Sequence, residues 1–248
     1  MQIARRSFLA LSAVAEAADS LEHELRDAEA GLCDVHGAAP SLLFSLGPDK
    51  HPDLRHRLSG DLMRAAGSAK QYDRSADERA MLALFARAKP FAGSADDFRA
   101  SLCAANALVV PQAGLRRYEA GLPVTVGAIQ VLFPEPSRLA ARLEELHGFV
   151  KRRGSSVGTA IAVLAAMLNA HPFSDGNGRV ARALYAHLLG TIGLSGHFPF
   201  AAVFHASRGS FDLCLREGEI LGNWEPFVRY NARVLSIAAR HGVAAQPE

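Results

Sequence analysis

Apolar residues recur every three to four positions along most of this chain, which is the spacing of an amphipathic helix. The pattern predicts one or two helices over residues 4–31, followed by helices over 54–66, 76–88, 94–108, 137–152, 157–170, 179–189, 209–221 and 224–240. Glycine and proline gather over residues 36–53, where we expect a loop that contains a short helix. The predicted fold class is therefore all-α, a helical bundle.

The segment 157–170 differs from the other predicted helices because it is almost wholly apolar. A helix without a polar face is typical of the centre of a bundle, where neighbours cover it on every side. We therefore expect 157–170 to be the buried central helix, and to hold the residue that follows it, His171, in a fixed position.

One segment predicts β-structure. Residues that favour strands alternate over 122–133 on both sides of Gly127, as in a short hairpin. An isolated hairpin leaves a free strand edge, which can pair with an extended peptide of another protein. The alternative is an ordinary surface hairpin that packs on the helices.

Composition narrows the class of protein. The 248 residues leave room for one full domain and a smaller helical piece, and 49% of them are hydrophobic, enough for a substantial core. A net charge of +2 without basic runs argues against a dedicated nucleic-acid binder. Cys33, Cys103 and Cys214 are odd in number and widely spaced, as in reduced proteins of the cytoplasm. No apolar run is long enough to cross a membrane.

The N-terminus resembles an export signal at one point, because Arg5 and Arg6 form a twin arginine. The apolar stretch that follows is weakly hydrophobic and about eight residues long before Glu16 interrupts it. We therefore expect an amphipathic first helix and a cytoplasmic protein.

Residues 171–182 read His-Pro-Phe-Ser-Asp-Gly-Asn-Gly-Arg-Val-Ala-Arg and combine several groups that suit phosphate chemistry. His171 can accept a proton from a hydroxyl near neutral pH. Asp175 is a hard oxygen ligand of the kind that Mg²⁺ takes together with phosphate oxygens. The bend over 176–178 exposes backbone N–H groups at the start of a helix, which is an anion site.

Two arginines strengthen this interpretation. Arg179 and Arg182 share a helix face and are expected in the first turn, where the helix dipole disfavours cations. A polyphosphate between them and the dipole would explain their presence. The segment is not a P-loop, because no Lys-Ser/Thr follows the glycines. It is not a dinucleotide fingerprint, because a predicted helix precedes it.

This stretch resembles the signature of the Fic family, His-Pro-Phe-x-Asp/Glu-Gly-Asn-Gly-Arg-x-x-Arg, at every fixed position. The resemblance extends to a Gly-x-x-Arg segment at Gly114–Arg117, to a hairpin called the flap at 122–132, to Pro134–Pro136, and to Asn223–Phe227 at the start of the last helix. It implies a Fic domain over 95–240, an N-terminal helical region over 1–94 and a tail over 241–248.

The resemblance implies transfer of a nucleoside monophosphate, usually AMP from ATP, to a Ser, Thr or Tyr hydroxyl of a target protein held along the flap. Such a protein acts in the cytoplasm or, as an effector, inside a host cell. The implied roles are catalytic base for His171, Mg²⁺ ligand for Asp175, and phosphate binding for Gly176, Asn177 (backbone and side chain), Gly178, Arg179 and Arg182.

Many Fic proteins restrain themselves with a helix that reads Ser/Thr-x-x-x-Glu-Gly/Asn, whose glutamate pairs with the second arginine of the signature. Ser12–Ala17 matches this pattern except at its last position. Ser12 and Glu16 are therefore candidates for an inhibitory motif. The alternative is an ordinary helix with an exposed glutamate.

Other readings remain at this point. Some Fic-like proteins transfer UMP, phosphocholine or a terminal phosphate, or remove AMP; Gly178 favours nucleotidyl transfer over phosphate transfer, which goes with lysine there. A non-catalytic interaction module with the same fold is a further alternative. A metal hydrolase built on His171, Asp175 and His187 fits no common ligand spacing.

Overall fold

The computed structural model describes residues 11–21, 26, 76–110, 114–124, 129–193 and 208–240. The elements are α1 Leu11–Ser20, α6 Ala76–Ala88, α7 Ala95–Ala107, β1 Gly121–Val124, β2 Ile129–Leu132, the 3-10 turn η1 Pro136–Arg138, α8 Leu139–Arg153, α9 Val157–Ala170, α10 Asn177–Thr191, α12 Arg208–Leu221 and α13 Glu225–Arg240.

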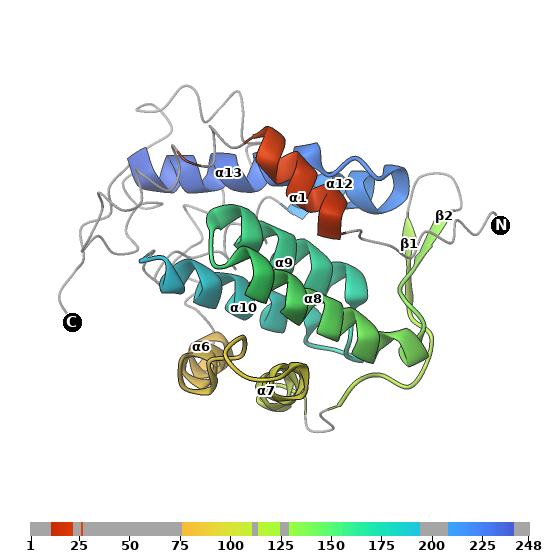
Figure 1. The fold of residues 1–248 in the computed structure, drawn as a ribbon. Coiled ribbons are helices and arrows are strands. Elements are labelled where there is room, and N and C mark those ends of the chain that lie inside the picture. The colour runs from red at the N-terminus through yellow and green to blue at the C-terminus, as the bar shows by residue number, and fades with distance from the viewer. Residues whose placement is uncertain are drawn as a thin grey trace.

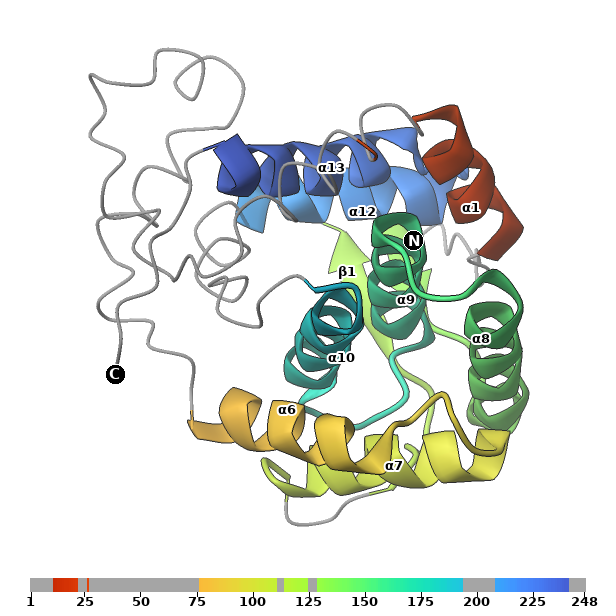
Figure 2. The same ribbon diagram turned by 60° about the vertical axis from the view of Figure 1, so that its left-hand side comes forward.

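The helices stack around α9. In Figure 1, α8, α9 and α10 form the middle of the molecule, with α1, α12 and α13 above them and α6 and α7 below. Helix α9 packs against α1, α8, α10 and α13, and Figure 2 shows α6 and α7 crossing beneath α10 and α8. The core is therefore continuous from α1 to α13, with α9 at its centre.

The apolar sequence of α9 explains its position. Ile161 and Val163 lie on opposite sides of the helix and both are 0% exposed, as expected for a helix covered all round. Ser156 caps its start, because the Ser156 side chain accepts a hydrogen bond from the Thr159 amide. His171 caps its end, as the sequence predicted.

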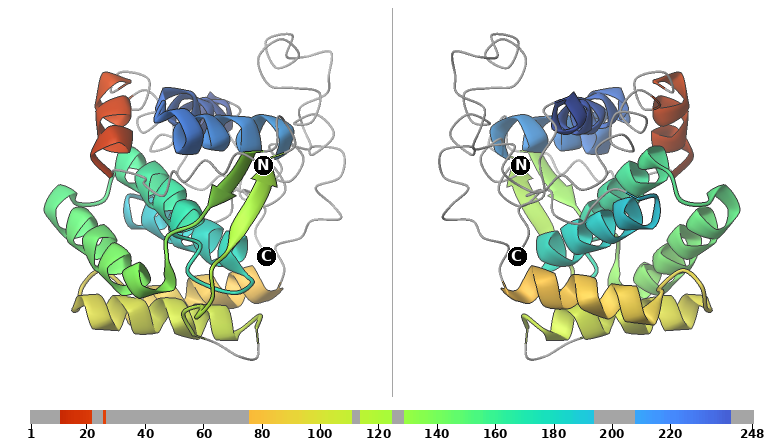
Figure 3. Two further views of the ribbon diagram at one scale, coloured as in Figure 1. Left: turned by 90° about the vertical axis from the view of Figure 1, so that its right-hand side faces the viewer. Right: turned by 90° about the vertical axis from the view of Figure 1, so that its left-hand side faces the viewer.

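The predicted hairpin segment contains two short antiparallel strands. β1 pairs with β2 in a register that places Gly121 opposite Leu132 and Val124 opposite Ile129. The pair stands beside the helices, as Figure 3 shows. The connecting residues 125–128 lie outside the described part of the chain.

The all-α prediction is confirmed, and the helices at 76–88 and 157–170 have the predicted bounds. Helix α10 begins at Asn177, two residues earlier than predicted, so Arg179 lies in its first turn and Arg182 in its second. The expectation that both arginines share the first turn was wrong for Arg182.

The predicted helix at 54–66, the loop at 36–53 and the tail at 241–248 fall outside the described residues. Within the described part of the chain, no helix is long and apolar enough to span a membrane.

Truncation of Leu164 to alanine is expected to lower the free energy of unfolding by about 2–5 kcal/mol, because α9 is enclosed and the cavity cannot close. Leu213→Ala is the matched control, since Leu213 on α12 is 71% exposed. This variant should change the free energy of unfolding by less than about 0.5 kcal/mol. Urea unfolding followed by circular dichroism measures both. Equal losses in the two variants would contradict the central position of α9.

Candidate active site

Residues 171–182 form the loop that joins α9 to α10 and the first turns of α10. His171 ends α9 in the left-handed conformation (φ 45°, ψ 56°), and its amide donates to the Met167 carbonyl at 3.1 Å. This conformation is unusual for a residue with a side chain, so the surrounding contacts must hold it. Gly176, also left-handed (φ 81°), is the N-cap of α10.

The Asn177 side chain fastens this loop from inside. Its Oδ1 accepts from the Phe173 amide and its Nδ2 donates to the Phe173 carbonyl, both at 2.8 Å. Phe173 is 0% exposed and Asn177 is 4% exposed. The side chain of Asn177 is therefore engaged by the loop itself, and its contact with a phosphate stays a prediction. Its backbone amide remains at the start of α10.

A second asparagine, which the sequence analysis missed, fastens the same loop from α7. Asn106 is 1% exposed and its Nδ2 donates to the Asp175 carbonyl at 2.8 Å. A Cβ at Gly176 would lie 2.6 Å from that Nδ2. Glycine is therefore required at 176 for both its positive φ and the close approach of α7.

Arg116 is a further residue that holds this loop and that the sequence analysis missed. The Gly-x-x-Arg spacing pointed to Arg117, which is exposed, whereas Arg116 is 3% exposed. Its Nε donates to the His171 carbonyl at 2.7 Å, and its two Nη groups donate to the carbonyls of Tyr118, at 2.8 Å, and Pro134. One buried guanidinium thus joins the end of α9 to both ends of the hairpin.

The His171 imidazole is held in a partly buried environment that favours its neutral form. The pKa of His171 is lowered to about 4, chiefly by burial and also by the positive charges of Arg116 and Arg216, while Asp175 acts in the opposite direction. The ring of Phe133 stacks on it, with 4.1 Å between centroids and 3° between planes. At pH 7 the ring is therefore unprotonated and able to accept a proton.

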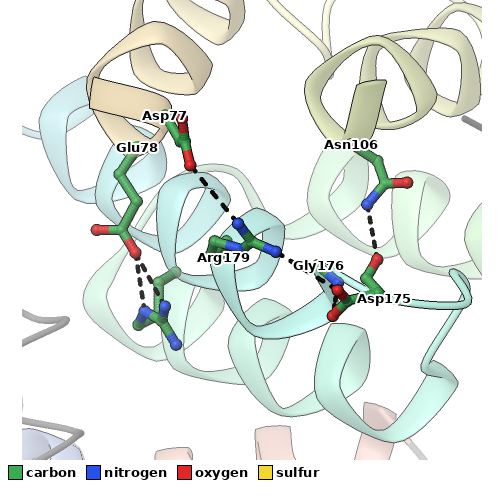
Figure 4. Close-up of polar contacts among 7 residues, drawn as sticks. Asp77, Glu78, Asn106, Asp175, Gly176 and Arg179 are labelled. Atoms are coloured by element: carbon green, nitrogen blue, oxygen red, sulfur yellow. Dashed lines mark hydrogen bonds and ion pairs between the residues drawn. The ribbon is translucent and has the colours of Figure 1, made fainter. Parts of the chain in front are cut away.

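Arg179 lies between Asp175 of the loop and Asp77 of α6 (Figure 4). The Asp175 side chain is 77% exposed; its Oδ1 accepts from the Gly176 amide at 2.6 Å and its Oδ2 lies 3.7 Å from Arg179. Arg179 is also 3.5 Å from Asp77 of α6. Both ion pairs are long and solvent-accessible, so they are weak and can be exchanged for a ligand.

Arg182 is held much more tightly than Arg179. Its Nε and Nη2 donate to one oxygen of Glu78, at 3.1 and 2.9 Å, and the Glu78 side chain is 8% exposed. Glu78 follows Asp77 in the first turn of α6, so adjacent carboxylates face both arginines of the motif (Figure 4).

Ser12 and Glu16, the candidates for an inhibitory motif, lie on α1, which packs against α9 and α13. Their side chains are outside the described residues.

The arrangement suits an anionic ligand more than an all-protein metal site. The first N–H groups of α10, at Asn177, Gly178 and Arg179, have no acceptor within the helix and lie at the positive end of its dipole. No group of three His, Cys, Asp or Glu side chains that could hold a metal occurs among the described residues. His171, Asp175 and His187 therefore do not form the three-ligand group that the metal-hydrolase alternative needs. His187 lies beside Phe85, with 6.0 Å between ring centroids.

The exposed Asp175 carboxylate still fits Mg²⁺ in the form in which that ion accompanies nucleotides. Mg²⁺ keeps several waters and binds through one or two carboxylates together with phosphate oxygens. Asp175 supplies one carboxylate next to the anion-binding end of α10. A bound nucleotide would have to provide the remaining oxygens.

Two comparisons relate the chain to known proteins. Residues 99–189 match the model of the Fic/DOC family. The structure is similar to that of a Fic family protein from Desulfovibrio desulfuricans G20, with a TM-score of 0.54, 17% sequence identity, and coverage of 97% of this chain and 76% of the other. At this identity the similarity concerns the fold. A search of curated proteins found no match.

The lowered pKa of His171 gives a direct test. Its ring protons should titrate near pH 4 in the folded protein and near 6.5 in urea. Because the unfolded chain binds this proton more readily, His171 should lower the free energy of unfolding as the pH falls from about 6.5 to 4. NMR titration, with His171→Gln to assign the resonance, measures the midpoint. A midpoint near 6.5 in the folded protein would contradict the burial of this ring.

Proposed function

We propose that this protein, whose residues 99–189 match the model of the Fic/DOC family, transfers AMP from ATP to a Ser, Thr or Tyr hydroxyl of a target protein. The observation that carries the proposal is the position of a neutral His171 beside the N-terminus of α10. A proton acceptor and an anion site on one rigid loop are what the attack of a hydroxyl on a phosphate ester requires.

The chemical step begins with the target hydroxyl within reach of His171. The imidazole takes the hydroxyl proton while the oxygen forms a bond to the α-phosphorus, and the bond from that phosphorus to the pyrophosphate oxygen breaks. A ring with a pKa near 4 is a weak base in the free protein. The negative charge of the bound phosphates would raise this pKa toward the working pH and so strengthen the base.

The charge of the phosphates would be met by the N-terminus of α10 and by Arg179. The backbone amides of Asn177 and Gly178 would cradle phosphate oxygens, joined by that of Gly176 once it exchanges its bond to Asp175. Arg179 would exchange its long contacts with Asp77 and Asp175 for the departing pyrophosphate. Mg²⁺, when bound at Asp175, would offset charge on the phosphate oxygens. Positioning and electrostatic stabilisation would thus supply most of the rate enhancement.

The hairpin would hold the target. An extended peptide that adds to a free edge of β1 or β2, within residues 122–132, would gain backbone hydrogen bonds that do not depend on its sequence. Arg116 links this hairpin to His171, so a peptide fixed on the strands would have a defined position relative to the base.

The transfer reaction is tested with Mg²⁺, a cell lysate and each of the four nucleoside triphosphates labelled at the α-phosphate. We expect label on protein from ATP, and a loss of about a hundred-fold or more in His171→Ala, because no group replaces the base. His187→Ala is the matched control, since His187 lies on α10 outside the loop and should retain activity.

Label from a different triphosphate would change the proposed donor and leave the transferase reaction in place. Equal labelling by wild type and His171→Ala would contradict the role of His171. Binding of ATP without label from any donor, in a variant relieved of inhibition, would favour an interaction module.

We also propose that Glu78 restrains the enzyme. In the family that this chain resembles, a glutamate on the second arginine of the signature blocks productive ATP binding, and here the buried Glu78 occupies Arg182. Glu78 comes from α6 and has no serine or threonine four residues before it, so the sequence pattern could not identify it. Glu16 is the competing candidate from the sequence.

Glu78→Gln is expected to raise self-labelling by about ten-fold, because loss of the charge frees Arg182 for phosphate. Glu145→Gln is the control, since Glu145 pairs with Arg142 on α8 and lies half exposed at 47%. Circular dichroism melting checks the fold of each variant. A Glu16→Gly variant that raises labelling while Glu78→Gln does not would move the inhibitory role from Glu78 to Glu16.

A further inference from the structure

The closest ring contact in the candidate site is made by a residue to which the sequence assigned no chemical role. Phe133 lies face to face with His171, at 4.1 Å between centroids and 3° between planes. Phe133 is 6% exposed, so its ring has little freedom to move away. The imidazole is therefore covered on one face, while its two nitrogens lie at the ring edge, outside the stack.

Phe133 belongs to the base of the hairpin as well as to the site. Its amide donates to the Ala120 carbonyl at 3.0 Å, which extends the β1–β2 pairing by one step beyond Gly121 and Leu132. The carbonyl of the next residue, Pro134, accepts from Arg116, whose Nε donates to the His171 carbonyl. The backbone of the hairpin base and the backbone of His171 thus share one buried guanidinium, and their rings share one stack.

A catalytic histidine needs a fixed ring orientation as well as a fixed backbone. In many hydrolases a carboxylate or carbonyl that binds the second ring nitrogen sets this orientation. Among the described residues, no hydrogen bond to either His171 ring nitrogen is present. The parallel stack is the contact that can resist rotation of the imidazole, and it leaves both nitrogens available to a hydroxyl.

We propose that Phe133 is the positioning residue of His171: it holds the imidazole plane so that a ring nitrogen faces a hydroxyl bound beside the hairpin. The inference rests on the proposed transfer function. In this role Phe133 does not contact the nucleotide. Loss of its ring should therefore affect the chemical step and leave nucleotide binding intact.

The kinetic test compares Phe133→Leu with Phe149→Leu. Both remove a buried ring, since Phe149 on α8 is 7% exposed, but the ring contact of His171 among the described residues is with Phe133 and not with Phe149. We expect kcat to fall about ten- to a hundred-fold in Phe133→Leu, because a small misplacement of the base costs this much, with KM for ATP unchanged. Phe149→Leu should keep kcat within about three-fold. Equal kcat values in the two variants, or a change confined to KM, would overturn the proposal.

A spectroscopic test separates this inference from the proposed function. Protons of an imidazole that lies over a phenyl face are shifted upfield by the ring current. The His171 resonances should therefore move downfield in Phe133→Leu and stay in place in Phe149→Leu, whether or not the wild-type protein transfers label. Unmoved resonances in Phe133→Leu would overturn the stack and the positioning role. A wild type without transferase activity but with the expected shift would instead count against the transfer function.

Discussion

The buried guanidinium of Arg116 is the contact on which the candidate site depends. It binds carbonyls from three segments: His171 at the end of α9, Tyr118 before β1, and Pro134 after β2. Taking a charged group out of water is costly unless its hydrogen bonds are satisfied, so these carbonyls must stay in place. These hydrogen bonds help to hold the left-handed backbone of His171, and they tie the base of the hairpin to the loop.

The rest of the loop follows the same principle, in which a buried polar side chain holds a backbone that would otherwise be free. Asn177 binds both backbone groups of Phe173, and Asn106 reaches across from α7 to the Asp175 carbonyl. These contacts leave the charged side chains of the motif at the surface of a rigid support. Arg179 and Arg182 are met there by Asp77 and Glu78, which offer negative charge where a phosphate would lie. A ligand that binds here would therefore compete with α6.

Sequence reasoning identified what depends on local pattern. The apolar run of α9 and the motif that follows it were correctly placed, because periodicity and residue type are visible over a short stretch. The partners of the motif were missed, because they are distant in sequence: Arg116 lies 55 residues from His171, Asn106 lies 69 from Asp175, and Glu78 lies 104 from Arg182. Phe133 was recognised as a strand former, but nothing local predicts that its ring would meet His171.

The most direct test of the central claim, transfer of a nucleotide and not of a phosphate, is a paired labelling experiment. Purified protein carrying Glu78→Gln is incubated with Mg²⁺ and ATP labelled at either the α- or the γ-phosphate, and label bound to protein is counted. Attack on the α-phosphorus predicts stable label from α-labelled ATP and none from γ-labelled ATP. Label from γ-labelled ATP alone would contradict the account and assign the loop to phosphoryl transfer.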